Sequence, residues 1–189
     1  MFSSSEIKEI VSHPNTLTLY RIIAIPIIIV LLFFPESRIC TFFAALIFTA
    51  AAITDFFDGY IARNKGLVSS LGKTMDPLAD KLLVSSVFIM MTHHGWVEAW
   101  IVCVIIGREF AVTGLRSIIV EKGEDVSASW LGKYKVGFQI AAIIPLLLHF
   151  DYFTFEMHKI GSFLLWIALI MTVWSGADYF IRFRKLMQD

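Results

Sequence analysis

Six long apolar runs leave this chain few ways to fold. They lie at about 17–35, 39–62, 76–93, 96–118, 134–150 and 160–182. Each is close to the ~20 residues that a helix needs to cross the hydrocarbon core of a bilayer. Hydrophobic residues make up 57% of the 189 residues, a share that excludes an ordinary soluble domain. The pattern predicts an all-α, polytopic membrane protein with six transmembrane helices in a single domain, residues 1–189.

The segment before the first run, residues 3–13, is too polar to cross a membrane. Ile7, Ile10 and Val11 fall on one face of a helix there, and the charged residues fall elsewhere. A short helix with one apolar face lies in the plane of the membrane interface. We therefore expect an amphipathic interfacial helix at 3–13.

The distribution of basic residues predicts the orientation. With six spans, both termini lie on the same side of the membrane. Of the 16 lysines and arginines, only Arg38 and Lys159 fall on the opposite side, which leaves 14 on the side of the termini. Because basic residues are retained in the cytoplasm, both termini are expected there. The formal net charge is zero, so nothing in the composition points to nucleic acid as a partner.

Acidic residues gather at the cytoplasmic ends of the second and third runs. There are four of them: Asp55, Asp58, Asp76 and Asp80. On a helix, Asp55 and Asp58 share a stripe about 100° wide with Gly59 and Ala62, whose small size leaves that face open. Asp76 and Asp80 are four residues apart and share a face if that segment is helical. Carboxylates this close to hydrocarbon need partners and usually have a function.

A divalent metal ion is one such partner, because like charges in a small volume cannot all stay ionised without neutralisation. Hard oxygen ligands suit Mg²⁺ or Mn²⁺, which commonly act on substrates that carry phosphate. The alternative is two solvated helix ends joined by a polar loop. Whether Asp76 lies inside the third helix or caps it stays open, because Pro77 follows it and the residue before a proline avoids the α region.

Basic residues on the fourth and fifth runs predict an anion pocket on the same side. Arg108 and Arg116 lie about 80° apart on a helix, with Glu109 on the same side. Guanidinium groups bind phosphate oxygens in bidentate fashion, so this pair suggests a phosphate clamp that Lys133 and Lys135 would complete. The alternatives are an internal Arg108–Glu109 ion pair, an arginine at the interface and lysines that snorkel.

The acidic segment resembles the signature of the CDP-alcohol phosphatidyltransferases, D-x2-D-G-x2-A-R-x8-G-x3-D-x3-D. All eight fixed positions are met: Asp55, Asp58, Gly59, Ala62, Arg63, Gly72, Asp76 and Asp80. The resemblance implies that CDP-diacylglycerol donates its phosphatidyl group to an alcohol and that CMP leaves. It also implies that two Mg²⁺ or Mn²⁺ ions are bound by Asp55, Asp58 and Asp76. Asp80 would bind one of the ions or act as the catalytic base.

The same resemblance implies a site for the CDP moiety. Gly59, Ala62, Arg63 and Gly72 would line it. The stretch N-T-L-T-L-Y-R at 15–21 is similar to the N-terminal entry of the family, which would bring Asn15 and Thr18 to the nucleotide.

The acceptor alcohol is indicated by four stretches, three of them not yet named. N-T-L-T-L-Y-R, G-R-E-F at 107–110, G-L-R at 114–116 and S-W-L-G-K-Y-K at 129–135 are similar to the branch of the family that uses sn-glycerol 3-phosphate. A phosphorylated acceptor also suits the four basic residues. Inositol phosphate, inositol and serine remain alternatives. The family further implies a homodimer surrounded by membrane phospholipids.

A transporter of divalent cations or protons would also carry acids within the membrane. Such a carrier is expected to place its acids near the middle of the bilayer and often to show internal repeats. Here the acids lie at one end and the two halves do not resemble each other. The sequence therefore favours the enzyme over the carrier.

Overall fold

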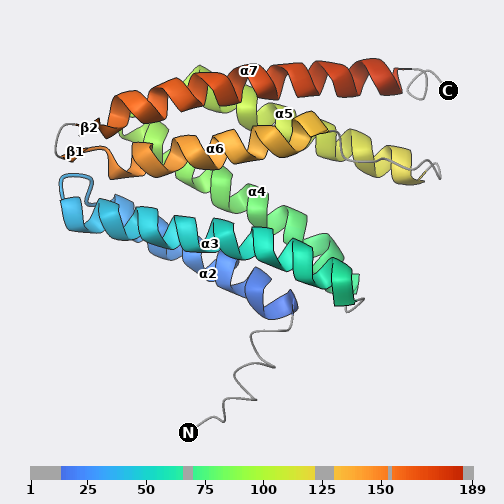
Figure 1. Cartoon of the computed structure of the whole chain (residues 1–189), viewed down its shortest axis with the longest axis horizontal. Helices are drawn as coiled ribbons and strands as arrows, with labels where there is room; N and C mark the ends of the chain where they lie inside the picture. Colours follow the sequence, from blue (N-terminus) through green and yellow to red (C-terminus); the bar gives the residue numbers. More distant parts are fainter. Residues whose placement is uncertain (1–13, 66–69, 122–129, 153–154, 185–189) are drawn as a thin grey trace, which may run out of the picture. The chain divides into compact units, whose positions relative to one another are not determined.

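The structure is a computed structural model that describes the backbone of residues 14–65, 70–121, 130–152 and 155–184 (Figure 1). Within these ranges, the side chains of residues 14–18, 55–77, 121, 130–131, 133, 152 and 182–183 are not described. The interfacial helix expected at 3–13 lies outside the described residues. The contacts group the chain into two compact units, residues 1–90 and 91–189, which are considered separately.

Helices dominate the described ranges, and the all-α prediction is confirmed. The helices are α2 (Pro14–Leu32), α3 (Arg38–Lys65), α4 (Ser70–His93), α5 (Ala99–Glu121), α6 (Trp130–Leu148) and α7 (Met157–Phe183). Strands β1 (Asp151–Tyr152) and β2 (Phe155–Glu156) form a small antiparallel hairpin between α6 and α7, which the apolar pattern does not predict. Each of the six predicted apolar runs coincides with one helix, and the differences lie at the helix ends.

In the first unit, α2 and α3 pack side by side and are joined by a short connection (Figure 1). Pro35 lies in that connection, where a proline cannot continue the preceding helix. Ser37 then caps α3, because its hydroxyl accepts a hydrogen bond from the backbone N–H of Cys40 at 3.4 Å. The sequence P-E-S thus ends one helix and starts the next.

The α2–α3 contact combines branched and small apolar residues. Ile28 and Leu32 of α2 are fully buried, as are Ala44 and Phe48 of α3. Alanine at such positions lets two helix backbones approach closely, which is how helices associate where hydrocarbon surrounds them.

The second unit begins at the C-terminal end of α4, which closes with a Schellman motif. The backbone N–H of Trp96 donates to the carbonyl of Met91 at 2.9 Å, and that of Gly95 donates to Thr92 at 3.0 Å. Gly95 has φ +71°, the left-handed conformation that a glycine adopts without strain. The H-H-G-W sequence therefore forms the sharp turn that leads into α5.

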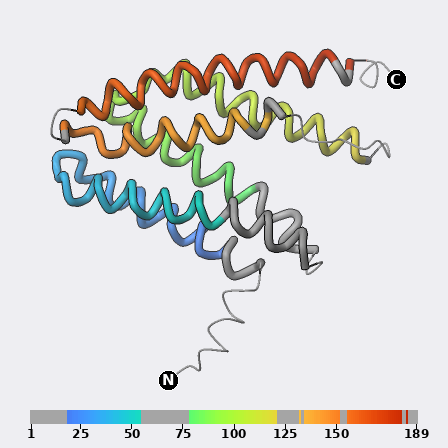
Figure 2. The backbone as a smooth tube through the Cα atoms, viewed as in Figure 1, coloured from blue at the N-terminus to red at the C-terminus, as the bar shows by residue number. Residues whose placement is uncertain are grey.

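Helix α7 runs back along α6 after the hairpin, and it also packs against α5 (Figure 2). Gly161 of α7 lies against Leu146 of α6. A Cβ at position 161 would lie 2.6 Å from Leu146 Cγ and 2.9 Å from its backbone nitrogen, closer than atoms pack. The close approach of α6 and α7 therefore depends on a glycine at this position.

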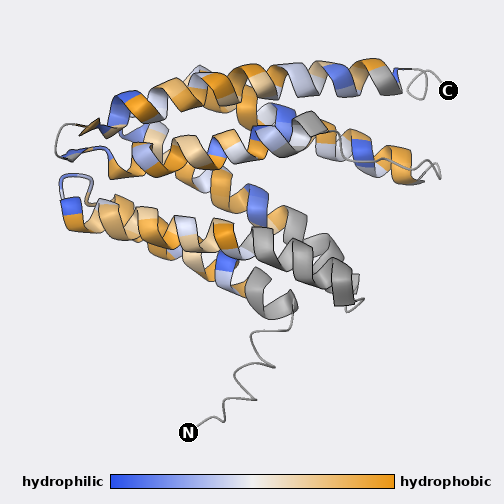
Figure 3. Cartoon of the chain, in the orientation of Figure 1, coloured by the Kyte–Doolittle hydropathy of each residue, from blue (hydrophilic) through white to orange (hydrophobic). Residues whose placement is uncertain are grey.

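Large apolar side chains cover the outward faces of the helices. In α7, Phe163, Ile170 and Trp174 are all more than half exposed. Figure 3 shows that α2, α3, α6 and α7 are coloured hydrophobic along much of their described length. Within the described ranges, one segment, Met157–Ile181, is long and apolar enough to cross a membrane by length and composition. Such surfaces suit lipid, so we treat the chain as a membrane protein.

Candidate functional site

The first half of the signature lies on one continuous helix. Asp55 and Asp58 belong to α3, which continues through both positions to Lys65. Because residues three apart on a helix share a face, the backbone places the two aspartates on the same side of α3. Gly59, Ala62 and Arg63 follow in the same helix. The structure does not describe the side chains of these five residues.

The second half of the signature also lies inside a helix. Because α4 begins at Ser70, Asp76 is well inside the helix. The structure therefore excludes Asp76 as the N-terminal cap of this helix, an alternative that the sequence left open. The predicted run begins only at 76, but the residues from Ser70 onward, which include Gly72, already belong to the helix. Asp76 and Asp80 consequently share a face as residues i and i+4.

The carboxylate oxygens of the signature aspartates are the type of donor that a divalent metal ion requires. Four carboxylates are a suitable ligand set for Mg²⁺ or Mn²⁺. Asp80 is the one signature aspartate whose side chain is described, and it is half-buried. Among the described side chains, no three acidic, histidine or cysteine groups come together as a metal site. The metal ligands stay a prediction.

The predicted nucleotide contacts at the start of the chain are also placed by backbone alone. Asn15 and Thr18 lie in the first turns of α2, three residues apart and so on one face. Their side chains are outside the described set, and their role stays a prediction.

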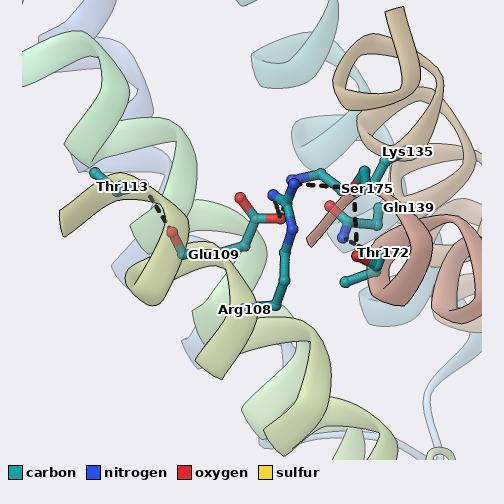
Figure 4. A network of polar contacts seen from close by, with 7 residues as sticks. All are labelled: Arg108, Glu109, Thr113, Lys135, Gln139, Thr172 and Ser175. Carbon is teal, nitrogen blue, oxygen red and sulfur yellow. Dashed lines mark hydrogen bonds and ion pairs between the residues drawn. The ribbon is translucent and has the colours of Figure 1, made fainter. Parts of the chain in front are cut away.

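A polar network lies inside the second unit, among α5, α6 and α7 (Figure 4). The ammonium of Lys135 in α6 contacts Oε1 of Glu109 in α5. Nη1 of Arg108 lies 3.5 Å from the same oxygen. The side chains of Lys135, Arg108 and Glu109 are exposed by only 4%, 12% and 16%. One carboxylate therefore holds two largely buried cations.

Helix α7 completes this network with residues that sequence reasoning missed. Nη2 of Arg108 donates to Oγ of Ser175 at 2.9 Å, and that hydroxyl donates to the carbonyl of Thr172 at 3.3 Å. Nε2 of Gln139 in α6 donates to Oγ1 of Thr172 at 3.3 Å. The sequence offers one signal for these residues, because Thr172 and Ser175 are two polar residues three apart in an apolar run. Both are fully buried in the structure, where polar groups need hydrogen-bond partners.

Gly176 gives the arginine room. A Cβ at position 176 would lie 3.1 Å from Cγ of Arg108 and 3.5 Å from its Nε. The Nε atom is itself buried and has no hydrogen-bond partner in the part of the chain that the structure describes. A buried donor without a partner is costly, which makes it a candidate contact for a ligand.

The other two predicted basic residues have different positions. Arg116 lies two turns further along α5 and is exposed. Buried Tyr179 of α7 interacts electrostatically with Arg108 and with Arg116, so both arginines lie near one residue. The backbone of Lys133 belongs to α6, but its side chain is not described. The structure thus brings Arg108 and Lys135 together and places Arg116 nearby.

The ion pair expected as the alternative to a phosphate clamp is present. Lys135 joins it, however, and the three groups together carry a net charge of +1. Buried charges are tolerated only when they are paired and hydrogen-bonded. A cluster with one cation in excess is suited to a further anion.

The profile of the CDP-alcohol phosphatidyltransferase family matches residues 11–174 of the chain. The chain belongs to this family, which makes it an enzyme of the phosphatidyl-transferring class. It is 43% identical to the CDP-diacylglycerol–glycerol-3-phosphate 3-phosphatidyltransferase of Bacillus subtilis (strain 168), over 88% of this chain and 92% of the relative. Relatives with the same name occur in Rickettsia bellii, at 42% identity over 91% and 95%, and in Shigella flexneri serotype 5b, at 34% identity over 93% and 97%.

Proposed function

We propose that this protein transfers the phosphatidyl group of CDP-diacylglycerol to sn-glycerol 3-phosphate and releases phosphatidylglycerophosphate and CMP. The observation that carries the proposal is the match to relatives named for this reaction along almost their whole length. The eight signature residues and the cationic pair of Arg108 and Lys135 are what such a reaction requires of the chain.

The signature acids serve the donor substrate. Asp55, Asp58 and Asp76 would hold two divalent ions, Mg²⁺ or Mn²⁺, and Asp80 would hold one of them or act as the base. Ions bound there would supply positive charge to the pyrophosphate of CDP-diacylglycerol and to the leaving phosphate. The smaller signature residues, with Asn15 and Thr18, line the site for the CDP moiety.

The basic network serves the acceptor. Arg108, Arg116, Lys133 and Lys135 bind the phosphate of glycerol 3-phosphate, which keeps the primary hydroxyl of the acceptor free to react. Arginine supplies paired donors with fixed geometry, whereas lysine supplies a point charge. Serine and inositol carry no phosphate and would not use this pocket, which is why a phosphorylated acceptor is favoured.

The reaction is an in-line exchange at one phosphorus atom. The sn-1 hydroxyl oxygen of the acceptor bonds to the β-phosphorus of CDP-diacylglycerol, and the bond from that phosphorus to the CMP oxygen breaks. Asp80, in its role as the base, accepts the hydroxyl proton, and CMP leaves with the electron pair of the broken bond. Positioning of the hydroxyl near the phosphorus supplies a large part of the rate.

We also propose how the chain is arranged in the membrane. The six helices span the bacterial inner membrane as one domain, the termini and active site face the cytoplasm, and residues 3–13 lie at the interface. The apolar outer surfaces and the distribution of basic residues support this. A site at this level takes the lipid donor from the bilayer and the acceptor from water. The functional unit is a homodimer among membrane phospholipids.

The decisive experiment measures CMP release by the purified protein with CDP-diacylglycerol and Mg²⁺. Glycerol 3-phosphate, inositol phosphate, inositol and serine are offered in separate reactions. Release with glycerol 3-phosphate alone is expected. Release with another acceptor would keep the chemistry and overturn the acceptor, and no release by folded protein with any of them would overturn the enzyme.

A further inference from the structure

The guanidinium of Arg108 is held from two sides. Glu109 of α5 faces Nη1, and Ser175 of α7 accepts a hydrogen bond from Nη2. Ser175 is itself fixed, because it is buried and its hydroxyl is bonded to the carbonyl of Thr172. The rotation of the arginine head is therefore set by its charged neighbour Glu109 together with Ser175, an uncharged residue 67 positions away in the sequence.

Nε lies on the edge of the Arg108 guanidinium that makes no hydrogen bond within the described ranges. This buried atom has no hydrogen-bond partner within the described ranges, and a Cβ built at Gly176 of α7 would lie 3.5 Å from it. An arginine binds a phosphate in bidentate fashion through two parallel N–H groups, of which Nε–H can be one. Any side chain at position 176 would press on the stem of the arginine beside this edge.

We propose that Ser175 and Gly176 of α7 are positioning residues that orient the Nε edge of Arg108 toward the phosphate of the acceptor. This inference rests on the proposed function and adds α7 to the elements that determine acceptor specificity. Ser175 supplies the hydrogen bond that fixes the head group, and Gly176 supplies the space that its stem occupies.

A methyl group at position 176 would displace the stem of Arg108. At 3.1 Å, the contact of a new Cβ with Arg108 Cγ is tighter than ordinary van der Waals contact, so the arginine stem must shift by a few tenths of an ångström. The fold changes little, because the three contacted atoms all belong to the arginine side chain and none to a helix backbone. The shift is large for a bidentate contact, whose strength depends on distance and angle.

The test compares steady-state kinetics of Ser175→Ala and Gly176→Ala with the wild-type protein. Each variant is expected to raise the KM for glycerol 3-phosphate by roughly tenfold, as for loss of one hydrogen bond to a charged group. The kcat and the KM for CDP-diacylglycerol should change less than about twofold, because the donor site is not touched. Ser175→Thr, which keeps the hydroxyl, should restore most of the acceptor affinity.

Matched controls come from the same unit. Gly137 in α6 has nothing within 4 Å of an added Cβ, so Gly137→Ala controls for the gain of a methyl group. Ser117 is exposed and its hydroxyl bonds to the carbonyl of Thr113, so Ser117→Ala controls for the loss of a hydroxyl. Neither should move the KM for the acceptor.

A double-mutant cycle shows whether the effect passes through Arg108. In an Arg108→Ala background, Gly176→Ala should produce no further rise in the KM for glycerol 3-phosphate. An unchanged acceptor KM in both single variants would overturn the inference, as would an equal loss in kcat and in both KM values. Absence of glycerol 3-phosphate-dependent CMP release by the wild-type protein would instead overturn the proposed function, so the two failures are distinguishable.

Discussion

The ammonium of Lys135 contacts the carboxylate of Glu109, and the two residues lie on different helices, 26 positions apart. Neither side chain is more than 16% exposed. Glu109 also faces Arg108, so the one acidic group in this contact keeps two cations at close range. The three side chains together therefore carry one positive charge in excess.

Removal of that negative charge should destabilise the fold. Glu109→Gln keeps the size of the side chain but leaves two buried cations without their anion, which costs about 3 kcal/mol. Denaturant unfolding of the protein in detergent measures the loss. Millimolar inorganic phosphate should recover part of it in the variant, because a bound anion replaces the missing carboxylate. Glu156→Gln removes an exposed ion pair with Lys159 and is the control, with no measurable change expected.

Truncation of Arg116 should weaken binding of the acceptor without affecting the chemical step. Arg116→Ala is expected to raise the KM for glycerol 3-phosphate by roughly tenfold, the value of a charge-assisted contact to phosphate, and to leave the KM for CDP-diacylglycerol unchanged. The CMP-release assay at varied acceptor concentration gives both constants. Arg184→Ala, at the end of α7, removes an exposed arginine outside the network and should behave as wild type. A larger effect on kcat than on the acceptor KM would contradict the assignment.

Loss of one signature carboxylate should abolish turnover. Asp58→Asn keeps the shape of the side chain but removes the charge that a divalent ion requires, and kcat should fall by at least about a thousandfold. Asp151→Asn, in the hairpin before α7, is the matched control and should keep wild-type activity. Turnover close to wild type in Asp58→Asn would contradict the metal-site assignment.

Depletion of divalent ions should have the same effect on the wild-type protein. Treatment with EDTA should abolish CMP release, and addition of Mg²⁺ or Mn²⁺ should restore it, because the carboxylate oxygens suit small, hard cations. Binding of Mn²⁺ to the wild-type protein, measured by electron paramagnetic resonance, should be lost in Asp58→Asn. Full activity after exhaustive chelation would exclude the proposed role of the ions.

The sequence predicts the helices well because each apolar run must be buried or face lipid, and the runs are long. It fails at the start of α4, where the mixed polar and apolar residues 70–75 belong to the helix although no long apolar run marks them. For the candidate site, Arg108 and Lys135 stand out because charges in apolar runs are conspicuous. Ser175 and Gly176 stand out less, since small residues are common in such helices and their importance depends on Arg108, which lies 67 and 68 positions earlier in the chain.

The packing of α7 on α6 provides a test of the fold that does not depend on activity. Gly161→Ala adds a methyl group 2.6 Å from Leu146 Cγ and 2.9 Å from the Leu146 backbone nitrogen. The side chain can rotate away, but the backbone of α6 cannot, so the helices must separate at a cost of about 1–3 kcal/mol. Unfolding of the purified variant measures this cost. Gly137→Ala makes the same change where nothing lies within 4 Å, and it should leave stability unchanged or raise it slightly through better helix propensity. Equal stabilities of the two variants would show that α6 and α7 do not approach each other at Gly161.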